Sequence, residues 1–111
     1  MASSPARLPG FDPVIHAPTR LAIVSLLAAS EWAEFKFIRE AAQLSDSNLS
    51  RQLTALEEAG YVRIRKGFVG KRPRTWASLS AKGRSAFQAH VAALQEIVAR
   101  AGELAAAATV G

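Results

Sequence analysis

The spacing of leucines between residues 44 and 60 predicts an amphipathic helix, and the rest of the expected fold is arranged around it. Leu49, Leu53 and Leu56 recur at intervals of four and three residues. At about 100° per residue they lie on one stripe, which must face a core. A serine and an aspartate precede the stripe and a glycine follows it, as expected for residues that cap the two ends of a helix. We therefore expect a helix over about residues 46–59.

The opposite face of this helix carries small polar groups and one arginine. The outward residues are Ser47, Asn48, Ser50, Arg51 and Thr54. In the major groove of DNA, arginine pairs with guanine, asparagine pairs with adenine, and hydroxyl groups contact either base. Asn48 and Arg51 are therefore the candidates for base readout, and the hydroxyl side chains are candidates for contacts to bases or phosphates. For the helix alone, a merely solvated polar face is an equally good explanation.

Two more helices are expected before the leucine-striped one. Residues 18–29 carry apolar side chains on two flanks, which suggests packing in the domain and against a second subunit; a helix buried deep in a monomer is the alternative. A short helix over about 36–43 follows, and residues 34–37 are either its first turn or a very short strand. A tight turn through Leu44 and Ser45 then leads into the leucine-striped helix. This spacing is typical of a helix-turn-helix.

The residues after the leucine-striped helix predict a basic hairpin. In the run from Tyr61 to Lys66, valine and isoleucine share one face of a strand and two arginines share the other. Residues 67–73 are rich in turn formers, and 74–79 are a second β-prone run. The cations expected to follow a phosphate backbone or reach a minor groove are Lys71, Arg72 and Arg74. A helix-turn-helix followed by such a hairpin is a winged helix, so the expected fold is mainly α with a small β-hairpin wing (α+β).

A last helix is expected from about residue 81 to roughly 101 or beyond, with Ser80 as its N-cap. Its apolar stripe follows a 4-3-4-3-4 spacing and consists of Phe87, Val91, Leu94, Val98, Ala101 and Ala105. Because such a helix extends beyond a small core, we expect it to form a homodimer seam with the helix at 18–29. The expected organisation is a disordered tail over 1–11, a winged-helix domain with terminal dimerisation helices over 12–101, and a frayed tail over 102–111.

The distribution of charge strengthens the expectation of a nucleic-acid partner. The chain of 111 residues has a formal net charge of +5, but no acidic residue lies between Glu58 and Glu96. That segment carries +8, so the remaining residues sum to −3. A basic segment of this kind fits a polyanion, because phosphate neutralisation releases counterions. A basic membrane-surface patch is the weaker alternative, since the cations do not line one helix face opposite aromatic anchors.

Composition limits the remaining chemistry. The chain has no cysteine, which excludes disulfides and thiolate metal sites and is compatible with a reducing cytoplasm. His16 and His90 are far apart in sequence and are interpreted as ordinary surface or capping residues. Trp32 and Trp76 are interpreted as core or wing-support residues rather than the lining of a ligand pocket. We find no catalytic motif, cofactor site, metal site, membrane span or secretory signal, and expect a cytoplasmic, nucleoid-associated protein that is not an enzyme.

Three stretches of the sequence carry a resemblance to a known family, namely HAPTRLAIVSLL, LSDSNLSRQLTALEEAGYV and KGFVGKRPRTWASLSAKGR. From about residue 12 to 97 the chain resembles the MarR/ArsR-type winged helix-turn-helix transcriptional regulators, and most closely the small winged-helix DNA-binding family without a separate effector domain. The resemblance implies homodimers on pseudo-palindromic operators, with the first and last helices at the dimer interface. It also implies that the helix after Ser45 and the wing read the DNA. Metal-sensing members use Cys- and His-containing sites, and this chain departs from them.

The residues and the resemblance together predict a sequence-specific regulator that binds double-stranded DNA as a homodimer, with repression as the expected sign. Two alternatives stay open. In the first, the winged helix is a protein-interaction module that docks its basic hairpin on an acidic partner. In the second, it is a sensor that binds a small-molecule effector beneath the dimer helices.

Overall fold

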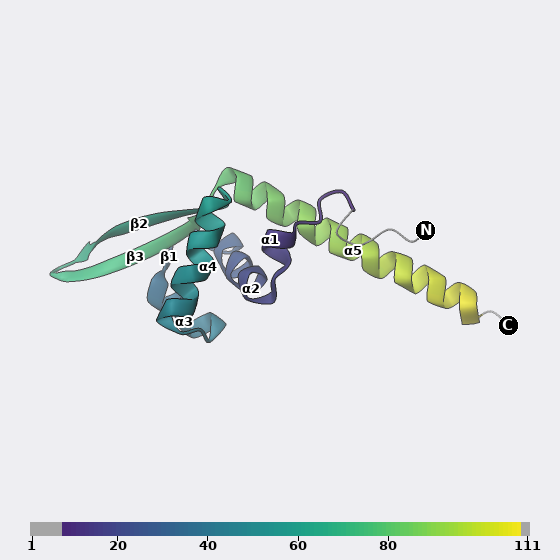
Figure 1. Cartoon of the computed structure of the whole chain (residues 1–111), viewed down its shortest axis with the longest axis horizontal. Helices are drawn as coiled ribbons and strands as arrows, with labels where there is room; N and C mark the ends of the chain where they lie inside the picture. The colour runs from purple at the N-terminus through teal and green to yellow at the C-terminus, as the bar shows by residue number, and fades with distance from the viewer. Residues whose placement is uncertain (1–7, 110–111) are drawn as a thin grey trace.

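A computed structural model describes residues 8–109 and shows five helices and three strands in them (Figure 1). In chain order these are α1 (Pro13–His16), α2 (Pro18–Ala28), β1 (Ala33–Glu34), α3 (Phe35–Ala42), α4 (Asp46–Glu58), β2 (Val62–Val69), β3 (Arg72–Leu79) and α5 (Ala81–Thr109). The mainly helical fold with a small wing is the fold that the sequence predicts. The wing projects from one end of the domain, and α5 extends from the other end.

Capping groups define where the helices begin and end. The Ser45 hydroxyl accepts a hydrogen bond from the Asn48 amide at 3.1 Å at the start of α4, and Gly60 follows the helix with a φ of +81°. The Ser80 hydroxyl accepts from the Gly83 amide at 2.9 Å at the start of α5. An accepting side chain at the N-terminus and a left-handed glycine after the C-terminus satisfy backbone groups that the helix leaves unpaired. The predicted positions of these ends are confirmed.

The core lies between α2, α3, α4 and the sheet. Leu49, Leu53 and Leu56 of α4 are at most 4 % exposed, which confirms the predicted stripe. Full burial of one such side chain contributes about 1.5–3 kcal/mol. The other members of the core cluster are Ile23, Val24, Leu27, Ala33, Ile38, Val62, Ala77 and Leu79. The larger apolar side chains of α2 therefore pack mostly within their own domain.

The sheet has the strand order β1-β3-β2, and both pairings are antiparallel. The ladder between β2 and β3 runs without interruption from the pair Val62 and Leu79 to the pair Val69 and Arg72. The strands are thus longer than predicted, and the tip expected over 67–73 is a two-residue turn. Gly70 takes the first turn position with a φ of +64°, a conformation that a tight hairpin needs and that glycine adopts without strain.

Helix α5 continues to Thr109, so residues 102–109 are helical where the sequence predicted a frayed tail. The alanine-rich composition of this stretch favours helix. All of its residues from Val98 onward are exposed, and the molecule measures 69 × 24 × 22 Å along its principal axes. None of the helices in residues 8–109 is both long and apolar enough to cross a bilayer. Most of the tail predicted over 1–11 lies outside the described residues.

The two histidines meet where the N-terminal segment packs on α5. His90 is 0 % exposed, and its Nδ1 accepts a hydrogen bond from the Asp12 amide at 2.9 Å. Its Nε2 lies 3.3 Å from Nδ1 of His16. The interpretation of His90 as an ordinary surface or capping residue is therefore wrong. The contact could not be predicted from the sequence, because the two histidines are far apart in it and only the packing of α5 against α1 brings their side chains together.

Candidate nucleic-acid interface

The outer face of α4 is polar and accessible, as the sequence predicts. Ser47, Ser50, Arg51 and Thr54 are exposed, and Asn48 is half-buried. The buried leucines on the other side of the helix fix which face points outward. All the side chains proposed from α4 thus belong to one surface.

Asn48 is engaged by its neighbours rather than free. Its Oδ1 accepts hydrogen bonds from Gln52 Nε2 at 3.0 Å and from Arg51 Nη2 at 3.3 Å. Gln52 in turn accepts from Arg20 Nη1 at 3.1 Å through its Oε1. A bidentate contact to adenine needs the asparagine oxygen as an acceptor, and in this arrangement that oxygen is occupied. Asn48 therefore holds the exposed guanidinium of Arg51 through its oxygen.

An open cleft of about 620 Å³ separates α4 from the wing. Its lining consists of Phe35, Asp46, Ser50, Leu53, Thr54, Glu57, Ile64, Lys66 and Thr75. The hydroxyl of Thr54 donates to the Ser50 carbonyl at 2.9 Å, which leaves its oxygen able to accept a further hydrogen bond. One face of the wing and the polar face of α4 therefore share a surface, so that one ligand can touch both.

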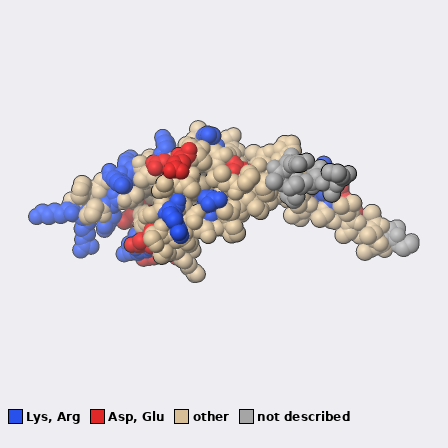
Figure 2. Space-filling model, viewed as in Figure 1, with Lys and Arg blue, Asp and Glu red and all other residues tan. Residues whose placement is uncertain are grey.

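Lysine and arginine side chains gather over the wing end of the molecule (Figure 2). Lys71 and Arg72 are exposed at the turn, as predicted. Arg74 differs, because its Nε lies 2.9 Å from Oε1 of Glu34 on β1. That ion pair neutralises much of its charge within the chain. Lys71 and Arg72 are therefore better placed than Arg74 to bind an anion.

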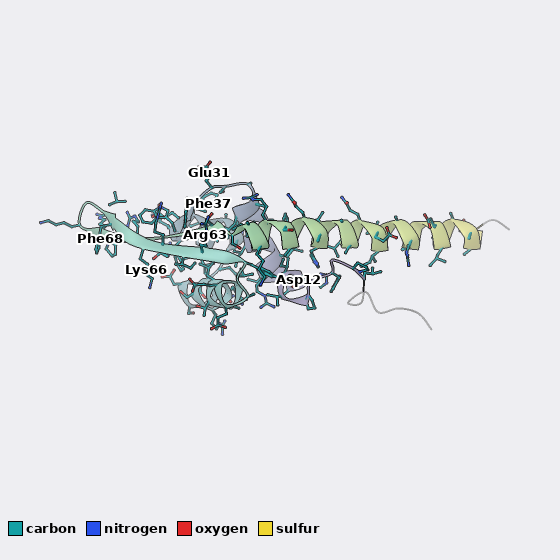
Figure 3. The ribbon with its side chains drawn as sticks, turned by 90° about the horizontal axis from the view of Figure 1, so that it is seen from above. Asp12, Glu31, Phe37, Arg63, Lys66 and Phe68 are labelled. Carbon is teal, nitrogen blue, oxygen red and sulfur yellow. The ribbon has the colours of Figure 1, made fainter. Side chains whose placement is uncertain are left out.

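Lys66 was not among the predicted site residues, although it lines the cleft opposite Ser50 and Thr54. Figure 3 shows Lys66 on the α4 side of β2 and Arg63 on the other side. The strand alternation contained the necessary signal, because Lys66 is in phase with Ile64. The predicted strand assigned faces only to its apolar side chains and the two arginines, so the lysine was missed.

The opposite face of the wing holds arginines against tryptophans. The guanidinium carbon of Arg65 lies 4.4 Å from the ring centroid of Trp32 and 5.7 Å from that of Trp76. Arg63 lies 5.6 Å from the Trp32 centroid. Cation–π contacts of this kind contribute about 0.5–1 kcal/mol at exposed sites. They support the interpretation of both tryptophans as wing-support residues, and they direct these two arginines away from α4.

Two further cations of the basic segment have structural roles at helix ends. Lys82 donates through Nζ to the Ala59 carbonyl at 3.0 Å, beyond the end of α4. Arg84 donates through Nη1 to the Ala28 carbonyl at 3.1 Å, at the end of α2. Cations at helix C-termini satisfy unpaired carbonyls and interact favourably with the helix dipole. Within the basic segment, the cations that line the cleft or stand free at the wing turn are Lys66, Lys71 and Arg72.

Comparison with known proteins agrees with this geometry. A family model described as "Winged helix DNA-binding domain" matches residues 19–98. An uncharacterized protein of Methanocaldococcus jannaschii is 33 % identical over 78 residues, which cover 70 % of this chain and 85 % of that protein.

Solved structures resemble the chain as well. A transcriptional regulator homologue from Pyrococcus horikoshii OT3 is 26 % identical with a TM-score of 0.72, covering 77 % of this chain and 84 % of that one. ZitR from Lactococcus lactis, a zinc-responsive MarR family member, shares the fold with 23 % identity and a TM-score of 0.56, covering 78 % of this chain and 58 % of its own. The match to a DNA-binding domain family and the likeness to a transcriptional regulator homologue support a DNA-binding regulator. The chain belongs to the winged helix DNA-binding domain family and has the fold of MarR-type transcriptional regulators.

Proposed function

We propose that the protein is a sequence-specific repressor that binds double-stranded DNA as a homodimer. The observation that supports this most directly is the shared surface of α4 and the wing, where Ser50 and Thr54 face Lys66 across one cleft. In winged-helix complexes the recognition helix lies in the major groove, which here would bring the wing against the adjacent backbone or minor groove.

The proposed roles follow from what each side chain can still bind. Arg51 is exposed and oriented by Asn48, so it is the residue assigned to bidentate readout of guanine. Ser47, Ser50 and Thr54 contact bases or phosphates through their hydroxyls. Lys66, Lys71 and Arg72 neutralise phosphates and supply affinity that does not depend on sequence. Arg74 contributes less, because Glu34 already pairs with it.

The proposed dimer rests on α5. Val98 and Leu104 are 71 % and 73 % exposed, respectively, on a helix that continues well beyond the core. Covering such apolar side chains with a second α5 removes them from water. A two-fold axis would place two copies of α4 in successive major grooves, with half-sites about 34–36 Å apart. A dimer bound in this way at a promoter would block access to it, which is the reason for proposing repression and a location at the nucleoid.

Selection of bound duplexes from a random pool, followed by two substitutions, tests the assignment of roles. Arg51→Ala should relax the preference at one base position and cost about 1–3 kcal/mol on the selected duplex. Arg72→Ala should weaken binding to all duplexes alike and reduce the slope of log affinity against log salt by about 1. Fluorescence anisotropy at several salt concentrations measures both effects.

Both arginines are exposed, so the variants should keep the melting temperature of the parent protein, and this serves as the folding control. Uniform loss of affinity in both variants would show that Arg51 is a phosphate contact instead. Recovery of no preferred sequence from the pool, even at low salt, would contradict sequence-specific binding altogether.

A further inference from the structure

Exposed apolar side chains lie directly beside the cationic turn of the wing. Phe68 is 72 % exposed and Val69 is 57 % exposed, and Pro73 pairs with Phe68 across the hairpin. Single exposed apolar residues are common on protein surfaces. Here, however, Phe68 and Pro73 pair with each other just before the turn, and Figure 3 shows Phe68 near the end of the wing that projects from the domain. Their position suggests contact with a partner.

The tip is held in place by the rest of the wing. The strands stay paired up to Val69 and Arg72, and only Gly70 and Lys71 form the turn. Just below the tip, the Trp76 ring covers Gly67 so closely that a Cβ added there would lie 3.3 Å from the ring. The wing therefore presents Phe68 from a defined position, unlike a flexible loop that could fold its apolar groups back onto the domain.

The alternation of the strand places Phe68 on the same face as Lys66. Side chains two residues apart point to one side of a strand, and Lys66 lines the cleft toward α4. Lys71 and Arg72 stand at the adjacent turn. A duplex held by α4 and by these cations would therefore meet the phenyl ring at the same time as it meets the phosphate-binding groups.

We infer that Phe68 is an apolar wedge that enters the minor groove beside the operator half-site. The inference rests on the proposed DNA-binding function and adds a second source of sequence preference to it. Apolar side chains inserted from the minor groove partly unstack a base step, and pyrimidine–purine steps such as TA unstack most easily. The wing then selects flanking DNA by its deformability, without a hydrogen bond to a base.

The test uses the full chain and duplexes that share one selected half-site and differ only in the flanking step under the wing. The parent protein should bind the duplex with TA at that step about fivefold or more tightly than the duplex with GC. Phe68→Ala should lose this preference and bind the TA duplex at least about fivefold more weakly, the lower limit expected for losing one ring–base contact. Lys71→Ala is the matched control from the same turn, and it should weaken both duplexes equally while keeping the preference.

A fluorescent base analogue gives a readout that mere loss of affinity would not produce. With 2-aminopurine at the flanking step and saturating protein, the parent and Phe68→Leu should raise the emission through unstacking, whereas Phe68→Ala should not. Equal binding and equal emission for the parent and Phe68→Ala would overturn the inference about Phe68. If the same samples still show a sequence preference that depends on Arg51, the proposed DNA-binding function is unaffected by that result. If no form of the protein binds any duplex at low salt, the proposed function fails first, and the wedge fails with it.

Discussion

At the scale of single residues, Asp12 connects three parts of the molecule. Its carboxylate caps α1 by accepting the Val14 amide at 2.9 Å and also accepts the Tyr61 hydroxyl, while its own amide donates to His90 on α5. The hydrogen bond to Asp12, and secondarily burial, raise the pKa of Tyr61 to about 12. Because Tyr61 lies between α4 and β2, Asp12 links the segment after α4 to α5.

His90 makes the stability of the protein depend on pH. Burial, and then the neighbouring His16, lower the pKa of His90, and the Asp12 carboxylate opposes this only in part. The folded state therefore binds fewer protons than the unfolded chain, whose histidines have a pKa of about 6.5. The contribution of His90 is complete above that pH and is lost as the pH falls below it. Protonation at Nδ1 would also remove the acceptor of the Asp12 amide.

We expect the free energy of unfolding to decrease between pH 7.5 and pH 5.5, with a slope from His90 of at most about 1.4 kcal/mol per pH unit. Urea unfolding at fixed protein concentration measures it. The variant His90→Gln cannot titrate, so its curve should be flatter than the parent's even if the variant is less stable at every pH. Parallel curves for the two proteins would show that His90 has no such role.

At the scale of elements, the junction between α4, β2 and α5 depends on the absence of a side chain at Gly83. A Cβ at this position would lie 2.1 Å from the Tyr61 carbonyl oxygen, and backbone atoms cannot yield as a flexible side chain can. Gly83→Ala should therefore lower the free energy of unfolding by about 1–3 kcal/mol, as overpacked sites do. Thermal and urea unfolding at one protein concentration measure the change.

The same helix offers a matched control. Gly102 also lies within α5, and a Cβ there would meet nothing within 4 Å. Gly102→Ala should raise the free energy of unfolding by up to about 1 kcal/mol, since alanine is the better helix former. Opposite signs for the two substitutions are the expected result, and a stabilising or neutral Gly83→Ala would contradict the close approach.

Features set by neighbouring residues could be predicted from the sequence, and features set by contacts between distant residues could not. The four longer helices were predictable because apolar spacing and capping residues act over one or two turns, as in the stripe from Leu49 to Leu56. The ion pair of Arg74 with Glu34 and the contact between His16 and His90 were not, since each joins residues that only the fold brings together. The length of the wing was underestimated for a similar reason. Pairing across the hairpin, with Trp76 packed on Gly67, extends β2 through a glycine that the sequence alone marks as a turn former.

At the scale of the whole molecule, the two ends have different surfaces. The wing and α4 carry the exposed cations and hydroxyls, whereas the far end is the single helix α5, about 44 Å long at 1.5 Å per residue. Its apolar residues from Val91 to Ala105 recur on one side, and those beyond Val98 have no cover from the rest of residues 8–109. A second copy of the chain would cover this stripe and leave the α4 and wing surfaces of both copies free.

Adjacent positions on α5 allow a sharp test of that dimer. Val98 lies on the apolar stripe, and Ala99 points about 100° away from it; both are exposed. By two-fold symmetry, Val98→Glu puts two carboxylates into the proposed seam and should raise the dimer dissociation constant by about 100-fold or more. Ala99→Glu adds the same charge beside the seam and should leave association nearly unchanged. Sedimentation equilibrium at micromolar concentration should show dimers for the parent and Ala99→Glu and monomers for Val98→Glu. A monomeric parent, or equal association of the two variants, would mean that this stripe does not join two copies.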